Sequence, residues 1–203
     1  MDYLSDLFVR YPILSVCKDD ISAVYDALTA CFKSQKRLYV FGNGGSAADA
    51  LHIVGELAKS FVLERPLDPE FAANVCGDLA TNLQGALPAY AIVENTAFTT
   101  AFVNDCKPEY VFAQQVYAYA RMGDCVLGIS TSGNSENVLN GLSTAIGRGA
   151  VTIGLAGGSG GKMRAVCDHL IVVPENETYK IQELHLPVYH TLCLMLEMDF
   201  WGK

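Results

Sequence analysis

The sequence predicts an α/β fold in which a doubly wound parallel sheet of five strands is flanked by helices. Five short apolar runs recur along the 203 residues without alternating with polar residues, which is typical of strands covered on both faces. Helical patterns separate these runs, and strands that alternate with helices build parallel sheets. With 51% apolar residues, a chain of this length can form a full core as one domain, residues 1–203.

The expected elements follow in order along the chain. Two helices precede the first strand and form an N-terminal helical arm, residues 1–35. The predicted strands cover residues 37–42, 89–93, 125–130, 151–156 and 169–174. The predicted helices cover residues 46–61, 108–121, 134–148 and, as a long C-terminal helix, about 180–201. Pro108 suits a helix start, and Gly149 suits the residue that follows a helix end.

Composition and charge exclude several function classes. The formal net charge of -8 and the absence of any Lys/Arg cluster argue against nucleic acid and anionic membrane surfaces as partners. No run approaches the ~18 apolar residues of a membrane helix, and Asp2 and Asp6 stand where a secretory signal is basic. Seven scattered cysteines without a CxxC motif indicate free thiols, so we expect a cytoplasmic protein. Only 18% of residues are charged, which indicates apolar surface buried against other subunits.

A glycine-rich turn, residues 41–46 (FGNGGS), leads from the first strand into a helix. Glycines allow close approach to a ligand, and a helix N-terminus offers free N–H groups, so Asn43, Gly44 and Ser46 are candidate phosphate-binding residues. The turn lacks the Walker A pattern and the third glycine of GxGxxG. We therefore expect no nucleotide cofactor.

A second turn, residues 130–135 (STSGNS), follows the third strand and opens another helix. Its four hydroxyls exceed what helix capping needs, which is the alternative interpretation. Hydroxyls and helix N-terminal amides can bind a phosphate dianion without Lys or Arg. The candidate phosphate ligands here are Ser130, Thr131, Ser132 and Ser135.

Two helices carry acid–base side chains at helical spacing. His52 and Glu56 are four residues apart and share one helix face. Gln182 and His190 are eight residues apart on the last helix and can share a broad face. His185 lies on a different side of that helix from His190 and cannot easily join the same site. Each pair alone could be an ordinary surface or half-buried pair. If the two helices pack together, the four side chains can serve as acid, base or metal ligands.

The segments GNGGSAADALHIVGEL, ISTSGNSENVL and IQELHLPVYH, in this order, resemble the phosphoheptose isomerases of the sugar isomerase (SIS) domain superfamily. The resemblance runs from about residue 18 to the C-terminus. It implies isomerisation of sedoheptulose 7-phosphate to a heptose 7-phosphate in a homotetramer with active sites at subunit interfaces. By motif, Glu56 matches the catalytic glutamate and His190 the catalytic histidine. Some members bind zinc through the positions held here by His52, Glu56, Gln182 and His190.

The implied chemistry suits these residue types. Aldose–ketose isomerisation moves a proton between adjacent carbons through an enediol(ate). A carboxylate in an apolar setting suits the carbon base, and a histidine suits the group that shuttles protons between oxygens. We therefore expect Glu56 to act as base and His190 as acid or shuttle.

The sequence departs from the family pattern at four places. Ser60, with Lys59 beside it, stands where members usually carry Arg, and Asn95 and Tyr179 stand where members carry Asp. Residues 67–87 are an insertion between the first helix and the second strand. Its apolar residues recur every fourth position, so we expect one amphipathic helix packed on a neighbouring subunit near the site; the alternative is a surface excursion.

Two function classes remain open from the sequence. The first is an isomerase of sedoheptulose 7-phosphate or of another ketose phosphate. The second is a non-catalytic SIS protein that binds phosphosugars, such as the regulator that associates with the replication initiator DnaA. A pure sensor needs the phosphate-binding turn but can lose Glu56 and His190, and both are present here. The acid–base set therefore favours the enzyme.

Overall fold

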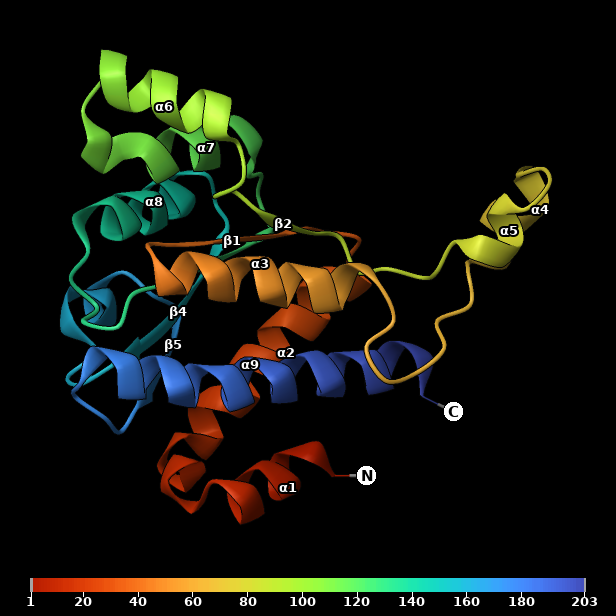
Figure 1. Cartoon of the computed structure of the whole chain (residues 1–203), viewed down its shortest axis with the longest axis horizontal. Coiled ribbons are helices and arrows are strands. Elements are labelled where there is room, and N and C mark those ends of the chain that lie inside the picture. The colour runs from red at the N-terminus through yellow and green to blue at the C-terminus, as the bar shows by residue number, and fades with distance from the viewer. Residues whose placement is uncertain (1, 203) are drawn as a thin grey trace.

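The computed structural model describes residues 2–202 and contains one five-stranded parallel sheet in the order β2-β1-β3-β4-β5 (Figure 1). The strands are β1 (Leu38–Gly42), β2 (Ala89–Ala91), β3 (Cys125–Ile129), β4 (Val151–Gly157) and β5 (His169–Val173). All five lie where the apolar runs predicted them. In the register of β1 with β3, Gly42 lies opposite Ile129, so the two candidate phosphate turns leave the same edge of the sheet side by side.

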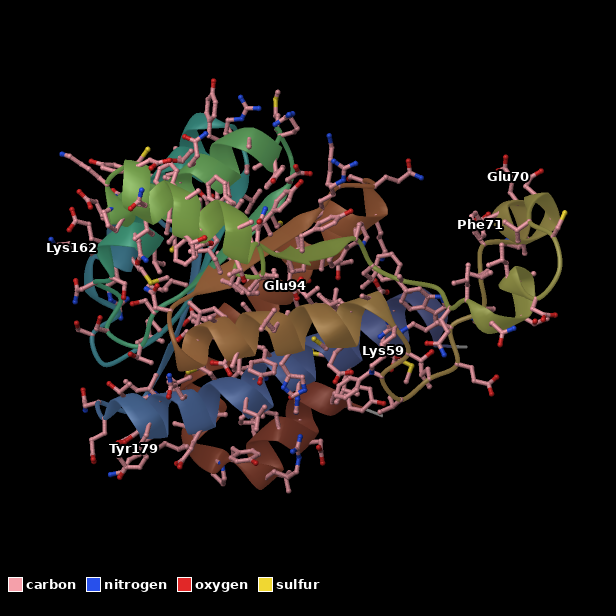
Figure 2. The ribbon with its side chains drawn as sticks, turned by 45° about the horizontal axis from the view of Figure 1, so that its top comes forward. Lys59, Glu70, Phe71, Glu94, Lys162 and Tyr179 are labelled. Carbon is pink, nitrogen blue, oxygen red and sulfur yellow. The ribbon has the colours of Figure 1, made fainter. Side chains whose placement is uncertain are left out.

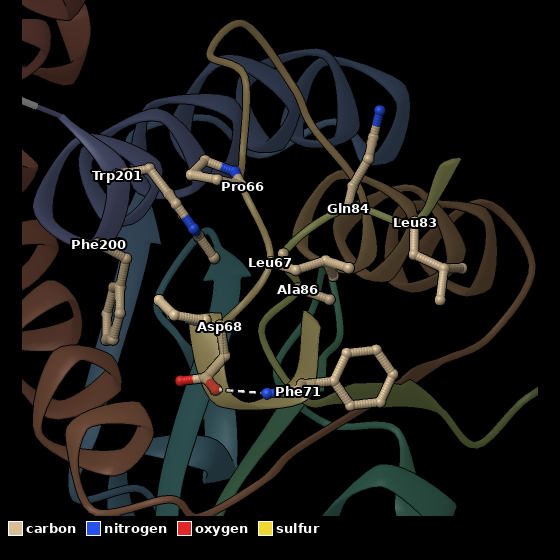
Figure 3. Close-up of a pocket in the computed structure, with 11 residues that line it drawn as sticks. Pro66, Leu67, Asp68, Phe71, Leu83, Gln84, Ala86, Phe200 and Trp201 are labelled. Atoms are coloured by element: carbon tan, nitrogen blue, oxygen red, sulfur yellow. Dashed lines mark hydrogen bonds between the residues drawn. The ribbon is translucent and has the colours of Figure 1, made fainter. Parts of the chain in front are cut away.

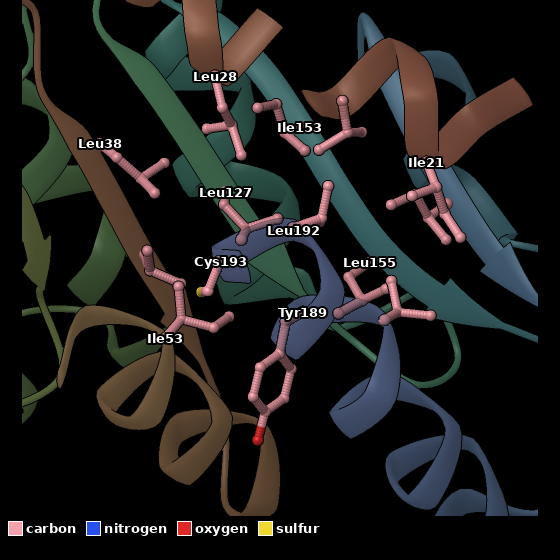
Figure 4. Close-up of a cluster of buried hydrophobic side chains, with 14 of the residues drawn as sticks. Ile21, Leu28, Leu38, Ile53, Leu127, Ile153, Leu155, Tyr189, Leu192 and Cys193 are labelled. Atoms are coloured by element: carbon pink, nitrogen blue, oxygen red, sulfur yellow. The ribbon is translucent and has the colours of Figure 1, made fainter. Parts of the chain in front are cut away.

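Helices cover both faces of the sheet. Buried residues of α1 (Tyr3–Arg10), α2 (Lys18–Lys33), α3 (Gly45–Ala58) and α9 (Thr178–Trp201) pack on one face, with Leu38 and Val40 (Figure 4). On the other face α7 (Val111–Tyr119) and α8 (Glu136–Gly147) pack with Tyr39 and Phe41, and α6 (Thr96–Asp105) lies outside them. This alternation along β1 is the two-residue period of a strand covered on both faces. The predicted doubly wound fold is confirmed.

The predicted helices are also found, with small shifts at their ends. The N-terminal arm consists of α1, a short 3₁₀ helix (Pro12–Cys17) and α2, and its residues Leu7, Leu14 and Ile21 belong to the main core. The predicted helix 108–121 begins as a 3₁₀ turn (Pro108–Tyr110) and continues as α7. Gly149 follows α8 with a φ of +71°, as a helix end requires. None of the helices in residues 2–202 combines the length and apolar character needed to cross a bilayer.

Two features of the chain differ from the sequence prediction. Helix α6 was not predicted; its N-terminus is set by Asn95, whose Oδ1 accepts a hydrogen bond from the Phe98 amide at 3.0 Å. The expected single helix in residues 67–87 is wrong, because the segment contains two short helices, α4 (Pro69–Asn74) and α5 (Leu79–Asn82). Between them Val75 is extended and Gly77 takes a φ of +65°, which interrupts the helical path. This segment projects from the body of the molecule (Figures 1 and 2).

The packing of α3 against α9 places the candidate site. Both helices run in the same direction. Gly45 at the start of α3 therefore contacts Gln182, and His52 contacts Tyr189 seven residues further along each helix. The buried positions of α3, Ser46, Ala50, Ile53 and Leu57, recur every three or four residues and face the core. The polar residues of both helices are thereby brought together along the line where α3 and α9 pack, which we call the α3–α9 groove.

Candidate active site

A cavity of about 320 Å³ joins the two candidate phosphate turns at the edge of the sheet. Its lining comprises Asn43, Gly44, Gly45, Ser46, Ile129, Ser130, Thr131, Ser135, Thr178 and Gln182. The hydroxyls of Ser130 and Ser135 are 2.9 Å apart within it. The cavity lies at the N-terminal ends of α3 and α8, where free amides and the helix dipoles favour an anion.

Most of the phosphate residues predicted from the sequence therefore meet in one place. Ser132 is the exception: it is exposed, and its Oγ accepts a hydrogen bond from the Asn134 amide at 3.2 Å. Asn43 exchanges two amide hydrogen bonds with Asn137, at 2.8 and 2.9 Å, which ties the glycine-rich turn to α8. Thr178 was not predicted, and only the fold reveals that the start of α9 closes the cavity.

Gln182 lines this cavity and packs directly on Gly45. A Cβ at Gly45 would lie 2.4 Å from Gln182 Nε2, closer than any real contact. The side chain of Gln182 thus lies beside the phosphate turns. It is about 12 Å along the helix from His190.

A second group of side chains lies further along the same groove. His52 Nε2 is 3.3 Å from Glu56 Oε1 and 3.4 Å from His190 Nε2. The two imidazole rings meet edge to face, with centroids 4.8 Å apart. Glu56 is mostly buried, with 13% of its side chain exposed, whereas His52 is 42% exposed. The fold therefore brings three of the four predicted acid–base residues into contact.

Lys59 supplies a cation to this group. Its Nζ lies 3.0 Å from Glu56 Oε2, and it also donates to the carbonyl of Ser60 at 3.0 Å. Because Ser60 stands where arginine was expected, the positive charge comes from the preceding residue in this chain. Figure 2 shows Lys59 at the C-terminal end of α3 and Tyr179 at the opposite end of the groove, where Tyr179 is exposed.

Two residues that sequence reasoning missed complete the group. The Tyr189 hydroxyl lies 3.0 Å from His52 Nδ1 and donates to Asp49 Oδ1 at 3.3 Å. Burial raises the pKa of Asp49 to about 6, against the lowering effect of the Tyr189 hydrogen bond. Burial and the Asp49 charge also raise the pKa of Tyr189. Asp49 precedes His52 by three residues and so shares its helix face, a signal that the sequence did contain.

The histidines of α9 differ in their surroundings. Burial, and then the neighbouring His52, lower the pKa of His190, so this imidazole is neutral at pH 7. His185 is fully buried away from this group, and burial lowers its pKa to about 4. Neither of its ring nitrogens has a hydrogen-bond partner among residues 2–202.

The donor atoms fit zinc in their chemistry and in two of their separations. Tetrahedral zinc with bonds of about 2.0–2.1 Å places neighbouring donors about 3.4 Å apart. The contacts of His52 Nε2 with Glu56 and with His190 have separations of 3.3 and 3.4 Å. Within the described part of the chain, however, no three or more His, Cys, Asp or Glu side chains are already arranged around one metal position. Gln182, the fourth expected ligand, lies beside Gly45.

Comparisons with known proteins agree with this arrangement. Residues 12–95 match the SIS domain family. A phosphoheptose isomerase from Trichlorobacter lovleyi is 41% identical over 182 residues, which cover 90% of this chain and 83% of that protein. A probable phosphoheptose isomerase from Thermoplasma acidophilum is 40% identical and covers 90% of both chains.

Solved structures show the same fold. The phosphoheptose isomerase from Francisella tularensis superposes with a TM-score of 0.79 at 28% identity, covering 96% of this chain and 93% of that one. The phosphoheptose isomerase from Neisseria gonorrhoeae gives a TM-score of 0.77 at 30% identity, over 93% and 90% of the two chains. The identities over nearly the whole length lead to one conclusion: the chain belongs to the phosphoheptose isomerase family of SIS-domain enzymes.

Proposed function

We propose that this enzyme converts sedoheptulose 7-phosphate to a heptose 7-phosphate through an enediol(ate), with Glu56 as the base and His190 as the acid or proton shuttle. One observation carries the proposal: the cluster of Glu56, His52 and His190 lies on the same two packed helices, α3 and α9, as Ser46 and Gln182, which line the cavity. Ser46 and His52 are six residues apart on α3, about 9 Å along the helix. That separation suits a seven-carbon sugar with its phosphate at one end and its carbonyl at the other.

The cavity is suited to hold the phosphate. Its described lining residues include hydroxyls and helix N-terminal amides but no Lys or Arg, so the dianion is bound by hydrogen bonds and helix dipoles. The phosphate is remote from the reacting carbons. Its binding energy therefore serves to orient the sugar in the groove.

The proton transfers fall to Glu56 and His190. Glu56 takes the proton from the carbon next to the carbonyl, and the electron pair forms the enediol(ate) double bond. His190 delivers a proton to the carbonyl oxygen and removes one from the neighbouring hydroxyl. Glu56 then returns its proton to the adjacent carbon. Lys59 and His52, which contact the two carboxylate oxygens, hold Glu56 in position for both steps.

Zinc, a homotetrameric assembly and a cytoplasmic location belong to the same proposal. His52, Glu56 and His190 would hold zinc, which would polarise the carbonyl, whereas Gln182, the fourth ligand expected from the sequence, lies with the phosphate turns. The assembly is supported by the projecting segment, whose apolar side chains Phe71, Leu79 and Leu83 are exposed. The location is supported by the seven cysteines, all free thiols within the described residues.

The test is turnover of sedoheptulose 7-phosphate followed by NMR, with added zinc and after chelation. Glu56→Gln is expected to lower kcat about 10²- to 10⁴-fold, the range for loss of a general base. The variant should still be protected from thermal unfolding by the sugar phosphate. Glu70→Gln, the same change on the projecting segment, is the matched control and should keep full activity. Wild-type turnover by Glu56→Gln would contradict the proposal.

The same assay separates the remaining alternatives. If wild-type protein is protected by sedoheptulose 7-phosphate but does not turn it over, other ketose phosphates are the next substrates to assay. If none of them is isomerised, a role as a phosphosugar-binding regulator replaces the enzymatic proposal.

A further inference from the structure

A second cavity, of about 450 Å³, lies beside the edge strand β2, and none of its lining residues lines the phosphate cavity. Tyr39 and Tyr90 lie opposite each other in the register of β1 with β2, and their rings stack with centroids 5.7 Å apart. Tyr119 adds a third ring; Arg37 lines the end where β1 and β2 begin, and Glu94 lines the opposite end. Tyr90 and Tyr119 are 50% and 46% exposed, so the aromatic walls of this tyrosine cavity are accessible to another molecule.

Cations from three separate parts of the chain gather at the end of the sheet where β1 begins. They are Lys36, Arg37, Arg121 and Arg148. The buried carboxylate of Asp124 accepts the backbone amides of Arg37 and Arg121 at 3.0 and 2.8 Å, and Arg148 Nε donates to the carbonyl of residue 120 at 3.0 Å. None of the four cations forms an ion pair in the part of the chain that the structure describes. This surface is therefore basic, although the net charge of the chain is -8, and it suits an acidic partner.

The projecting segment, residues 67–87, has the complementary character. It carries Asp68, Glu70 and Asp78 and contains no Lys or Arg. All three carboxylates are exposed, and none has an ion-pair partner among residues 2–202. The Asp68 carboxylate accepts the amide of Phe71 at 3.0 Å, which holds it at the start of α4 (Figure 3). Because Phe71 is 46% exposed, the segment presents an aromatic ring close to carboxylates, whereas the tyrosine cavity presents aromatic walls close to guanidinium groups.

We propose that the projecting segment of one copy docks on a second copy of this chain, with Phe71 in the tyrosine cavity and the carboxylates of Asp68 and Glu70 against Arg37. A cavity of this volume can hold a drug-sized molecule, so one aromatic side chain fits in it. Stacked rings supply attraction, and the opposite charges set the register. A second copy is the occupant because every copy offers both surfaces, which are used twice when two copies exchange their segments around a two-fold axis. This contact does not depend on the proposed reaction.

The first test replaces Phe71 of the full-length protein by photoreactive p-benzoylphenylalanine and mixes ¹⁴N- and ¹⁵N-labelled chains. Irradiation is expected to join two chains, and peptides of mixed isotope should link residue 71 to the peptide that contains Tyr90 or Tyr119. The matched control carries the same group at Tyr110, which is 44% exposed against 46% for Phe71, and it should give no such link. Links within one chain, links to any other part of the second copy, or no link at all would overturn the inference.

The second test reverses charges in the same cross-linking assay. Arg37→Glu is expected to lower the yield of the link about tenfold, because it places like charges opposite each other. Adding Glu70→Arg to that chain should restore most of the yield. The control is Lys162→Glu, the same change of charge on the side of the molecule away from the projecting segment, and it should keep the yield (Figure 2). Equal yields from Arg37→Glu and Lys162→Glu would overturn the proposed pairing of charges.

A measurement on the wild-type protein decides the matter if the variant at residue 71 does not fold. Carbodiimide couples carboxylates to amines that are already in contact. The expected product joins a carboxylate of residues 68–78 to Lys36 of a second copy, again identified by mixed isotopes. Absence of this product in a mixture that forms other links between copies would overturn the inference.

Discussion

Two regions of the molecule depart in opposite ways from the usual rule that apolar side chains are buried and polar ones exposed. One is the α3–α9 groove, and the other is the projecting segment, residues 67–87. The groove and its end near residue 65 bury the charged groups Glu56, Arg65 and Glu197, whereas the projecting segment exposes large apolar ones. Both departures are informative, since buried polar groups and exposed apolar patches are the unusual cases in a globular protein. The difference between them lies in where each side chain finds its partner.

In the groove the chain itself supplies the partners. Arg65 and Glu197 are fully buried and 2.7 Å apart. Glu197 also accepts the amides of residues 61–63 at 2.8 to 3.1 Å, and Arg65 donates to the carbonyls of residues 56 and 57 at 2.8 Å. The pair thereby satisfies backbone groups at the end of α3, including the carbonyl of Glu56. Burial of charge is tolerated here because nearly every donor and acceptor is used.

In the projecting segment the partners are not within the chain. Phe71, Leu79 and Leu83 are 46%, 52% and 47% exposed, and none of the residues described in α4 and α5 is buried. At its base a cavity of about 600 Å³ opens between the segment and the end of α9, lined by Leu67, Phe71, Leu83, Phe200 and Trp201 among others (Figure 3). Apolar side chains displayed in this way fit the expectation that the segment contacts another subunit, which stays a prediction.

The largest effect should come from breaking the buried pair of the groove. Glu197→Ala leaves Arg65 and the amides of residues 61–63 without their acceptor, and removing one partner of a buried pair costs about 3–5 kcal/mol. For a chain of this size the melting temperature should fall by about 10 °C. Thermal unfolding of the wild-type protein and the variant measures this fall in melting temperature. The control is Glu177→Ala, which breaks the exposed pair with Lys180 and should change stability by less than about 1 kcal/mol. Equal effects of the two variants would refute the distinction.

A smaller, pH-dependent effect should come from His185. Its pKa is about 4 when folded and 6.5 when free, so only the unfolded state binds a proton as the pH falls between these values. Stability is therefore lost on acidification from about pH 6.5 to pH 4, by up to about 3 kcal/mol at 1.36 kcal/mol per pH unit. His185→Leu should remove this part of the acid sensitivity. Urea unfolding of both proteins at pH 7 and pH 4.5 tests it, and parallel losses in the two proteins would contradict it.

The smallest effect on the folded chain should come from the projecting segment. Replacing Phe71, Leu79 and Leu83 together by Ser removes no buried contact, so the melting temperature of the monomer should change by less than about 2 °C. If the segment contacts another subunit, the same variant should lower the assembly state measured by light scattering. Val16→Ser and Met122→Ser, at more exposed apolar positions, are the controls. Unchanged assembly and substrate preference would remove the subunit role from the segment.

Local patterns along the chain were sufficient for much of the fold. The five strands were predicted because each apolar run is a property of a few consecutive residues, and the two turns at residues 41–46 and 130–135 were recognisable for the same reason. Helix α6 was missed because its amphipathic pattern is weak and its start depends on a single capping residue, Asn95. The break at Gly77 was missed because spacing by four continues across it.

The sequence by itself determined the sheet, most of the helices that flank it, the family and the residues proposed to carry the chemistry. Only the tertiary structure decided which of those residues meet. It placed Gln182 with the phosphate turns, His190 with His52, and Tyr189 with Asp49, 140 residues away in the chain. The physical reason is that these contacts depend on the direction, rotation and register of α3 against α9. Those quantities are set by packing over the whole core and leave no periodic trace in either helix alone.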